Sequence, residues 1–262
     1  MKESELKTAL LISGRGSTAK AVIKACQKGE LKGIIPIAVI CSKPDIPGKV
    51  MAESLGIKTF ICDRKDYSSR SKFGEALLKI LQSLQVDLVS QNGWLPLTPE
   101  NVVDVYRKRI FNQHPTPLDP GRENDFGGKG MHGVAAVSAW EAYRWLSGID
   151  LPIEATTHFV TNKYDKGDLI RVIGLNIPMF PKQITIAQLE SDKILQQHLR
   201  ERTAEIQNVL LPLEHQNVIE TLRLFAQGKV CGFRRDEPLV PSGNIGYVTQ
   251  AKRIAIQLFP EG

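Results

Sequence analysis

The chain has 262 residues, of which 42% are hydrophobic and 24% charged. This composition excludes a disordered or fibrous protein and is typical of one large globular domain or two small ones. The formal net charge is +6, with 34 Lys and Arg against 28 Asp and Glu. Because the basic residues are spread along the chain, the charge does not predict a nucleic-acid partner, although it suits small anionic ligands.

Cysteine usage and the first residues bound the cellular setting. The four cysteines form no CxxC pair and have no histidine at ligand spacing, so we expect free thiols in a reducing compartment and no metal site. The opening MKESELK lacks the apolar core of a signal peptide, and no apolar run approaches the length of a membrane span. We therefore expect a cytoplasmic protein that does not enter a membrane.

Strands and helices alternate through the first part of the chain. Short apolar runs predict strands over 8–13, 34–42, 58–62 and 87–91, and helical spacing of apolar residues predicts helices over 19–29, 69–85 and 98–106. This alternation predicts an α/β fold with a wound, mostly parallel sheet flanked by helices, as in Rossmann-like proteins.

The second part of the chain is less regular. In chain order, the pattern predicts a strand over 109–113, a long Pro- and Gly-rich loop over 115–130, a helix over 131–146, an antiparallel strand pair over 154–162 and 168–177, helix through most of 184–227 with a possible break near Pro212, and a short strand over 228–233. The remaining tail has only a weak pattern.

The motif SGRGST, residues 13–18, follows the first predicted strand and opens a helix. Glycines there allow a tight turn and leave backbone amides free, the helix dipole adds partial positive charge, and the side chains of Ser17 and Thr18 add hydroxyl groups. These features suit a phosphate. The motif matches neither the Walker A loop nor a full GxGxxG, and a plain tight turn in which Ser17 caps the helix is the alternative.

The motif IFNQHP, residues 110–115, places Asn112 and His114 two residues apart at a strand end. Alternate side chains of a strand share a face, so the amide and the imidazole point the same way. A carboxamide can donate to a developing oxyanion, and a neutral imidazole can accept a proton, so the pair suits acyl transfer. The alternative is a lone surface histidine.

The motif NKYDKGDLI, residues 162–170, places the carboxylate of Asp165 at a turn before a strand. Such a carboxylate can reach a nearby imidazole, fix its tautomer and raise its pKa. The alternative is an ordinary turn residue. We expect His158, in an alternating strand, to be a satisfied and partly buried ring. The pattern assigns no role to His132, His198 or His215.

Taken in order, four segments of the chain resemble the folate-dependent formyltransferases. They are residues 10–26, 111–118, 157–170 and 213–230, and the likeness extends over about 8–232. The resemblance is nearest to the purine-pathway members, and it implies a one-carbon group transferase. Such an enzyme would move the formyl group of 10-formyltetrahydrofolate to the primary amine of a phosphorylated acceptor, glycinamide ribonucleotide.

The resemblance also implies a site, position by position. It comprises Asn112, His114 and Asp165 as catalytic residues, Gly16, Ser17 and Thr18 as phosphate contacts, Glu214 as an acceptor contact, and Arg70, Leu95, Pro96, Leu97, Thr98 and Asn112 as folate contacts. It implies a reduced folate and a small phosphorylated amine as ligands, no metal, and a monomer or homodimer.

The departures from the family bear on domain organisation. The family's usual Gly-Asn-Gly-Ser-Asn loop reads Gly-Arg-Gly-Ser-Thr here, and GRENDFGGKG, residues 121–130, is inserted. We expect a catalytic domain over 1–232, with a phosphate-binding half at about 1–100 and a folate-binding and catalytic half at about 101–232. Residues 233–262 would form a C-terminal extension.

Three other functions remain open on these residues. An amino-sugar nucleotide could replace glycinamide ribonucleotide as the acceptor, given the altered loop and the insertion. The second function, hydrolysis of formyltetrahydrofolate, ranks below the others. Family members that hydrolyse carry a regulatory domain before the first strand, and here the first strand is predicted to begin near residue 8. A non-catalytic module that binds folate or a nucleotide would not require Asn112, His114 and Asp165 together.

Overall fold

The computed structural model describes residues 5–122 and 124–261. Seven strands form one sheet in the order β3-β2-β1-β4-β5-β6-β7. Their bounds are β1 Leu6–Ile12, β2 Ile34–Cys41, β3 Thr59–Ile61, β4 Leu88–Gln91, β5 Ile110–His114, β6 Ile153–Phe159 and β7 Leu169–Leu175. The pairings from β3 to β5 are parallel, which confirms the predicted wound sheet. The late antiparallel pair, β6 with β7, is also confirmed, and β6 pairs antiparallel with β5 as well.

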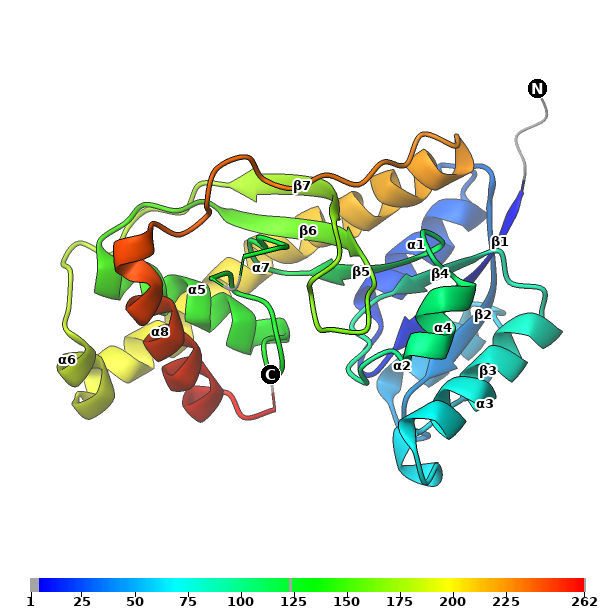
Figure 1. Ribbon diagram of the computed structural model, residues 1–262, viewed down its shortest axis with the longest axis horizontal. Helices are drawn as coiled ribbons and strands as arrows, with labels where there is room; N and C mark the ends of the chain where they lie inside the picture. The colour runs from blue at the N-terminus through cyan, green and yellow to red at the C-terminus, as the bar shows by residue number, and fades with distance from the viewer. Residues whose placement is uncertain (1–4, 123, 262) are drawn as a thin grey trace.

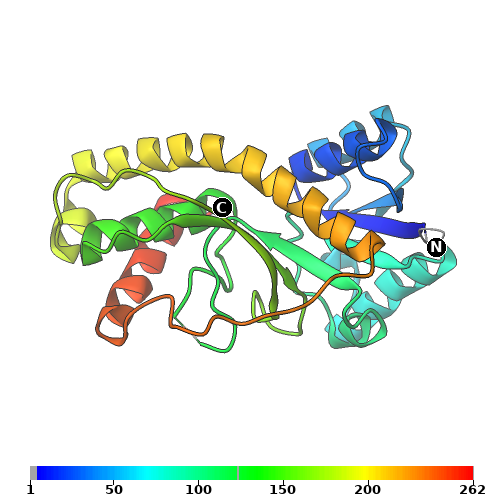
Figure 2. The same ribbon diagram turned by 90° about the horizontal axis from the view of Figure 1, so that it is seen from above.

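Helices cover both faces of the sheet and extend beyond it. They are α1 Ser17–Gln27, α2 Pro47–Ser54, α3 Arg70–Ser83, α4 Glu100–Val105, α5 Gly133–Ser147, α6 Ile186–Ser191, α7 Lys193–Ala226 and α8 Ile245–Leu258. Helices α1 to α4 surround the parallel strands at one end of the molecule, and α5, α6 and α8 gather at the other (Figure 1). Helix α7 extends from the end that contains α5, α6 and α8 to the end that contains the parallel strands (Figures 1 and 2).

The alternation of β1 divides the core around the sheet into two layers. Leu10 and Ile12 pack with α1 and α7 on one face, and Ala9 and Leu11 pack with α3 and α4 on the other. All four side chains are fully buried, as expected of a central parallel strand covered on both faces. Packing on both faces of the sheet therefore fixes the end of β1, from which the chain enters the loop at residues 13–16.

A further core surrounds α5, which is buried on almost every side. Trp140, Tyr143 and Trp145 of α5 pack against α7 and α8. The charged residues of this enclosed helix are paired, since Nη1 of Arg144 donates to Oε2 of Glu141 at 2.8 Å. Helix α8 supplies Val248 and Ile254 to this core, so the C-terminal tail is an integral part of this end of the molecule.

Three features differ from the sequence predictions. Helix α7 continues through Pro212, so the expected break is wrong. Leu210 and Glu214 are buried on either side of it, and this packing outweighs the roughly 3 kcal/mol that an interior proline costs. The strand expected over 228–233 is reduced to a single bridge between Leu169 and Phe233. Helices α2 and α8 were not predicted.

Within the described residues, none of the helices is both long enough and apolar enough to cross a membrane.

Candidate active site

A cavity of about 650 Å³ lies at the carboxyl ends of the parallel strands. The chain leaves β1 toward β2 on one side, whereas β4 lies on the other side of β1. Open α/β sheets bind their ligands at such a switch point. The lining comes from residues 13–18 after β1, 91–98 at the end of β4 and after it, 112–115 of β5 and its end, 128, 130–134, 158, 160, 161, 163–165 and 261, and from Gln207, Leu211 and Glu214 of α7.

The loop after β1 presents the start of α1 to the cavity. Gly16 has φ of 69° and is the N-cap of α1, and no side chain caps this helix. The alternative of a turn whose serine side chain caps the helix is therefore wrong. The first amides of a helix have no acceptor within it, so those after Gly16 are available to an anion. Gly16, Ser17 and Thr18 all line the cavity.

Backbone and hydroxyl contacts join this loop to the one after β4. The amide of Ser13 donates to the carbonyl of Gly93 at 3.0 Å, and the amide of Leu95 donates to Oγ of Ser13 at 2.9 Å. Farther along, Nε2 of Gln91 donates to Oγ1 of Thr98 at 2.6 Å, between two buried side chains. These contacts hold residues 95–98, the predicted folate segment, in the cavity wall.

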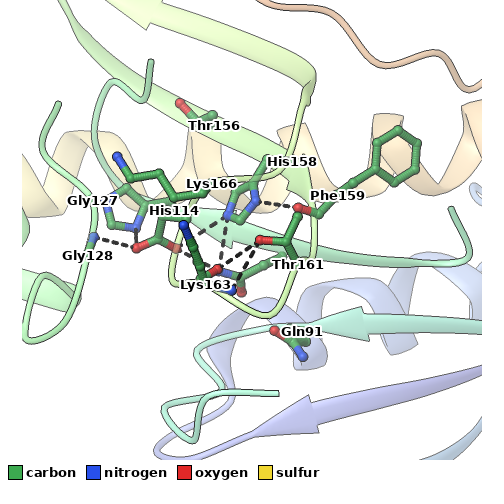
Figure 3. Close-up of polar contacts among 12 residues, drawn as sticks. Gln91, His114, Gly127, Gly128, Thr156, His158, Phe159, Thr161, Lys163 and Lys166 are labelled. Carbon is green, nitrogen blue, oxygen red and sulfur yellow. Dashed lines mark hydrogen bonds and ion pairs between the residues drawn. The ribbon is translucent and has the colours of Figure 1, made fainter. Parts of the chain in front are cut away.

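Asp165 lies at the centre of the polar cluster beside β5. It occupies a turn with φ of +53°, and its side chain is only 8% exposed. Oδ2 accepts the amide of Gly128 at 2.8 Å and lies 3.8 Å from Nδ1 of His114. Oδ1 lies 3.4 Å from Nε2 of His158 and 3.5 Å from Nδ2 of Asn112. Figure 3 shows the rings of His114 and His158 in this cluster. The fold thus brings Asn112, His114 and Asp165 together, and Asp165 is no ordinary turn residue.

The ring of His114 is held between Asp165 and a backbone carbonyl. It is 3% exposed, and Nε2 donates to the carbonyl of Phe126 at 3.2 Å, so this is not a surface histidine. In the neutral ring Nδ1 is then an acceptor that faces Asp165. Burial lowers the pKa of His114, although the charge of Asp165 acts in the opposite direction.

The carboxyl group of Asp165 remains ionised in this setting. Burial acts to raise its pKa, but the rings of His114 and His158 and the amide of Gly128 together hold the pKa well below its usual value. An ionised carboxylate beside a neutral imidazole stabilises a proton that arrives on the ring.

His158 belongs to the same cluster, and sequence reasoning missed this. Its Nδ1 donates to the carbonyl of Phe159 at 2.8 Å, so the ring is satisfied and buried as expected. Its Nε2 nevertheless lies 3.4 Å from Nδ2 of Asn112, because the two residues are directly opposite in the β5–β6 pair. His132 also lines the cavity, and burial lowers its pKa.

Glu214 lines the cavity from α7. It is 5% exposed and accepts hydrogen bonds from Nε2 of Gln113 and, at 3.1 Å, from Nε2 of Gln207. Burial raises the pKa of this carboxyl to about 7, against the lowering effect of both amides. Gln113 reaches α7 because it points to the opposite face of β5 from its two neighbours.

Arg70 is the predicted contact that lies apart from the others. It is the first residue of α3, and its Nη2 donates to the carbonyl of Asn162 at 3.4 Å. The described residues that line the cavity do not include Arg70. Its contact with folate stays a prediction. Over residues 5–122 and 124–261, no three His, Cys, Asp or Glu side chains are placed to hold a metal ion.

Residues 6–200 match the family model described as formyl transferase, and the chain therefore belongs to the formyl transferase family. This confirms the family that the four sequence segments indicated. The match ends before the second half of α7, so α8 lies outside it.

The names of individual relatives specify the substrate as well as the reaction. The chloroplastic phosphoribosylglycinamide formyltransferase of Arabidopsis thaliana is 31% identical over 179 residues, which cover 66% of this chain and 57% of that protein. The phosphoribosylglycinamide formyltransferase of Haemophilus influenzae is 28% identical over 71% of this chain and 78% of its own length. The crystal structure of glycinamide ribonucleotide transformylase 1 from Symbiobacterium toebii superposes with a TM-score of 0.65 at 28% identity, covering 90% of this chain and 94% of that one.

Proposed function

We propose that the chain transfers the formyl group of 10-formyltetrahydrofolate to the primary amine of glycinamide ribonucleotide, a step of purine biosynthesis. One observation carries the proposal: Asn112, His114 and Asp165 converge at a cavity whose wall also includes the helix-capping glycine loop. An acyl-transfer cluster and an anion-binding loop in one cavity suit a phosphorylated amine. The names of the relatives support this acceptor.

Asn112 would stabilise the oxyanion that forms when the amine adds to the formyl carbon. Its Nδ2 carries two hydrogens, so one can point toward His158 and Asp165 while the other is donated into the cavity. A preorganised donor of this kind typically contributes about 3–4 kcal/mol of transition-state stabilisation.

His114 and Asp165 would manage the proton that the attacking amine loses. The neutral ring of His114 has Nδ1 free to accept a proton, and the carboxylate of Asp165 lies 3.8 Å from that atom. The imidazolium would then be stabilised by the fixed negative charge of Asp165 and would return the proton to the leaving nitrogen of the folate. No covalent bond to the enzyme is needed.

The acceptor and donor would occupy different parts of the cavity. The amides after Gly16 would hold the phosphate, with Arg15 adding positive charge at the same wall, and Glu214 would contact the glycinamide end. The apolar sides of Leu95, Leu97 and Tyr164 suit a flat pterin ring, and 10-formyltetrahydrofolate would supply the formyl group there. The predicted division at residues 100 and 232, the cytoplasmic setting and a monomeric or homodimeric state stay predictions.

The proposal is tested by an assay that requires the donor. Purified enzyme and 10-formyltetrahydrofolate are mixed in three parallel reactions. The first contains glycinamide ribonucleotide, the second an amino-sugar nucleotide and the third no acceptor. We expect formylation of glycinamide ribonucleotide. Formylation of the amino sugar, release of formate without an acceptor, or binding without turnover would each replace the proposal with one of the alternatives.

The residue roles are tested by kinetics. Asn112→Ala and His114→Ala should each lower kcat by about two orders of magnitude or more, with KM largely kept, because these groups act on the transition state. Lys129→Ala, a change at an exposed position outside the cavity lining, is the control. Unchanged turnover in either site variant would remove that residue from the chemistry.

A further inference from the structure

The inserted loop and the C-terminal segment hold each other in place. Nη2 of Arg122 donates to the carbonyl of Asp236 at 2.8 Å, and Nε of Arg235 donates to the carbonyl of Leu118 at 2.8 Å. The amide of Leu239 donates to Oδ2 of Asp119 at 2.9 Å. Arg122 of the insertion, together with Leu118 and Asp119 just before it, therefore joins the C-terminal segment in one structural unit.

This unit contacts the polar cluster directly. The inserted loop contributes the carbonyl of Phe126 to the ring of His114 and the amide of Gly128 to the carboxylate of Asp165. Buried Asp125 shapes the loop, because it accepts the amide of Gly127 at 3.2 Å and pairs with Lys166 at 3.3 Å. The loop is thus neither a detached lid nor an idle surface feature.

Lys252 of α8 completes the unit from the opposite side. Its Nζ donates to the carbonyl of Gly127 at 2.7 Å. That carbonyl and the amide of Gly128 belong to the same peptide group. An ammonium that binds the oxygen of a peptide polarises it and strengthens the hydrogen bond that its N–H donates. The chain of contacts runs from Lys252 through one peptide to Asp165.

We propose that Lys252 is a positioning residue for Asp165, acting through the peptide between Gly127 and Gly128. The proposal rests on the proposed function for its catalytic consequence. Its structural content is independent: the ammonium fixes the orientation of that peptide, and the peptide fixes Oδ2 of Asp165 relative to Nδ1 of His114.

Other charged and titratable groups also act on this region. His114 on β5 and His158 on β6 face the carboxylate, and the charge of Asp165 acts on His132 before α5. Burial lowers the pKa of Lys252, while Asp125 raises it, Lys166 lowers it and Asp165 raises it. Lys252 differs from the others because it reaches Asp165 through a peptide that it can orient.

The test compares Lys252→Met with Lys129→Met. The first change removes the ammonium and keeps most of the side-chain length. The second removes the same charge from an exposed position of the inserted loop that contributes nothing to the cavity wall among the described residues. We expect Lys252→Met to lower kcat about ten- to a hundredfold with KM largely unchanged, the effect of weakening one hydrogen bond to a charged group. Lys129→Met should match wild type.

A second measurement does not depend on activity. In ¹H–¹⁵N NMR spectra, the amide proton of Gly128 should move upfield in Lys252→Met, because its hydrogen bond to Asp165 weakens. Lys252→Arg, which keeps a charged donor, should keep most of the wild-type shift and most of kcat. Lys252→Gln, which removes the charge but keeps a polar side chain, replaces Lys252→Met if that variant does not fold.

The two readouts separate the possible failures. An unaltered Gly128 signal in Lys252→Met would overturn the positioning role, whatever the reaction is. An altered signal with unaltered kcat in an active enzyme would also overturn it. Absence of formyl transfer by the wild type would overturn the proposed function alone, because the signal still tests the contact.

Discussion

Glu214 is a carboxyl group that the fold withholds from water. Its pKa rises to about 7 from an ordinary value of 4.5, since burial outweighs the hydrogen bonds from Gln113 and Gln207. A folded-state pKa above the unfolded value means that the native state prefers the protonated form. The corresponding stability is fully present below about pH 4.5 and is lost as the pH rises through about 7.

Glu214→Gln should remove this pH dependence. As the pH rises from below 4.5 to above 7, the wild type should lose about 3 kcal/mol of its free energy of unfolding relative to the variant. Urea unfolding of both proteins at pH 5, 6, 7 and 8 would measure most of this change. Parallel curves for the two proteins would show that Glu214 ionises normally.

At the residue scale, the sequence alone predicts which side chains of a strand lie on the same face. Asn112 and His114 are two apart on β5, and period-2 alternation alone places them together. The turn motif at 162–170 offered Asp165 as a carboxylate that could reach an imidazole, and the family resemblance matched it with His114. Glu214 came from the family resemblance alone, since no local pattern reports a contact across so many residues. His158 was missed as a member of the cluster because its role depends on strand register, although the alternation of β6 was visible.

At the scale of single elements, the inserted loop depends on a glycine without room for a side chain. A Cβ on Gly127 would lie 2.7 Å from Cβ of Asp165 and 2.7 Å from Cδ2 of Leu118. Cβ of Asp165 is held by its own backbone, and Cδ2 of Leu118 is an end methyl of a fully buried side chain, so one of these neighbours has to shift. The loop can approach the polar cluster this closely only because position 127 is glycine.

Gly127→Ala should therefore displace Asp165 and, if Asp165 acts as proposed, lower kcat about tenfold or more, because small misplacements of a catalytic group are costly. Gly243→Ala is the control, since a Cβ there meets no heavy atom within 4 Å. Both variants would be assayed well below their melting temperatures. Wild-type turnover in Gly127→Ala would mean that the cluster tolerates the movement.

Element prediction succeeded where periodicity was strong and failed where tertiary contacts decide. The parallel strands and the amphipathic helix at α3 were predicted within a few residues. Helix α8 was missed, although Val248, Ala251, Ile254, Ala255 and Leu258 recur at helical spacing, because the segments before it read as irregular. The continuity of α7 through Pro212 depends on two cores that no local window contains.

At the scale of the whole molecule, α8 supports the end of the protein built on α5. Ile254 is 2% exposed within the core that α5, α7 and α8 share, whereas Ile256, two residues along, is 42% exposed. The two isoleucines differ in environment and in little else, so they form a matched pair for measuring how far the tail stabilises the fold.

Ile254→Ala should lower the free energy of unfolding by about 2–5 kcal/mol, the usual cost of a buried isoleucine truncation. Ile256→Ala should cost about 0.5 kcal/mol or less, as for most surface substitutions. Chemical denaturation of both variants, followed by circular dichroism, gives the comparison. Equal losses would show that α8 packs too loosely to contribute.

The pairing of β5 with β6 has a consequence for how errors in folding would affect chemistry. Asn112 faces His158 and Gln113 faces Thr157 in this ladder. A slip by one residue would exchange the two faces of β5. The ring of His114 would then point toward α7, and the amide of Gln113 would point toward Asp165. Thr156 and Thr157 oppose such a slip, because their hydroxyls bond the carbonyl of Thr116 at 3.1 Å and Oγ1 of Thr221 at 2.8 Å. The hydroxyls of Thr156 and Thr157 thereby help to fix the strand register on which the positions of Asn112 and His114 depend.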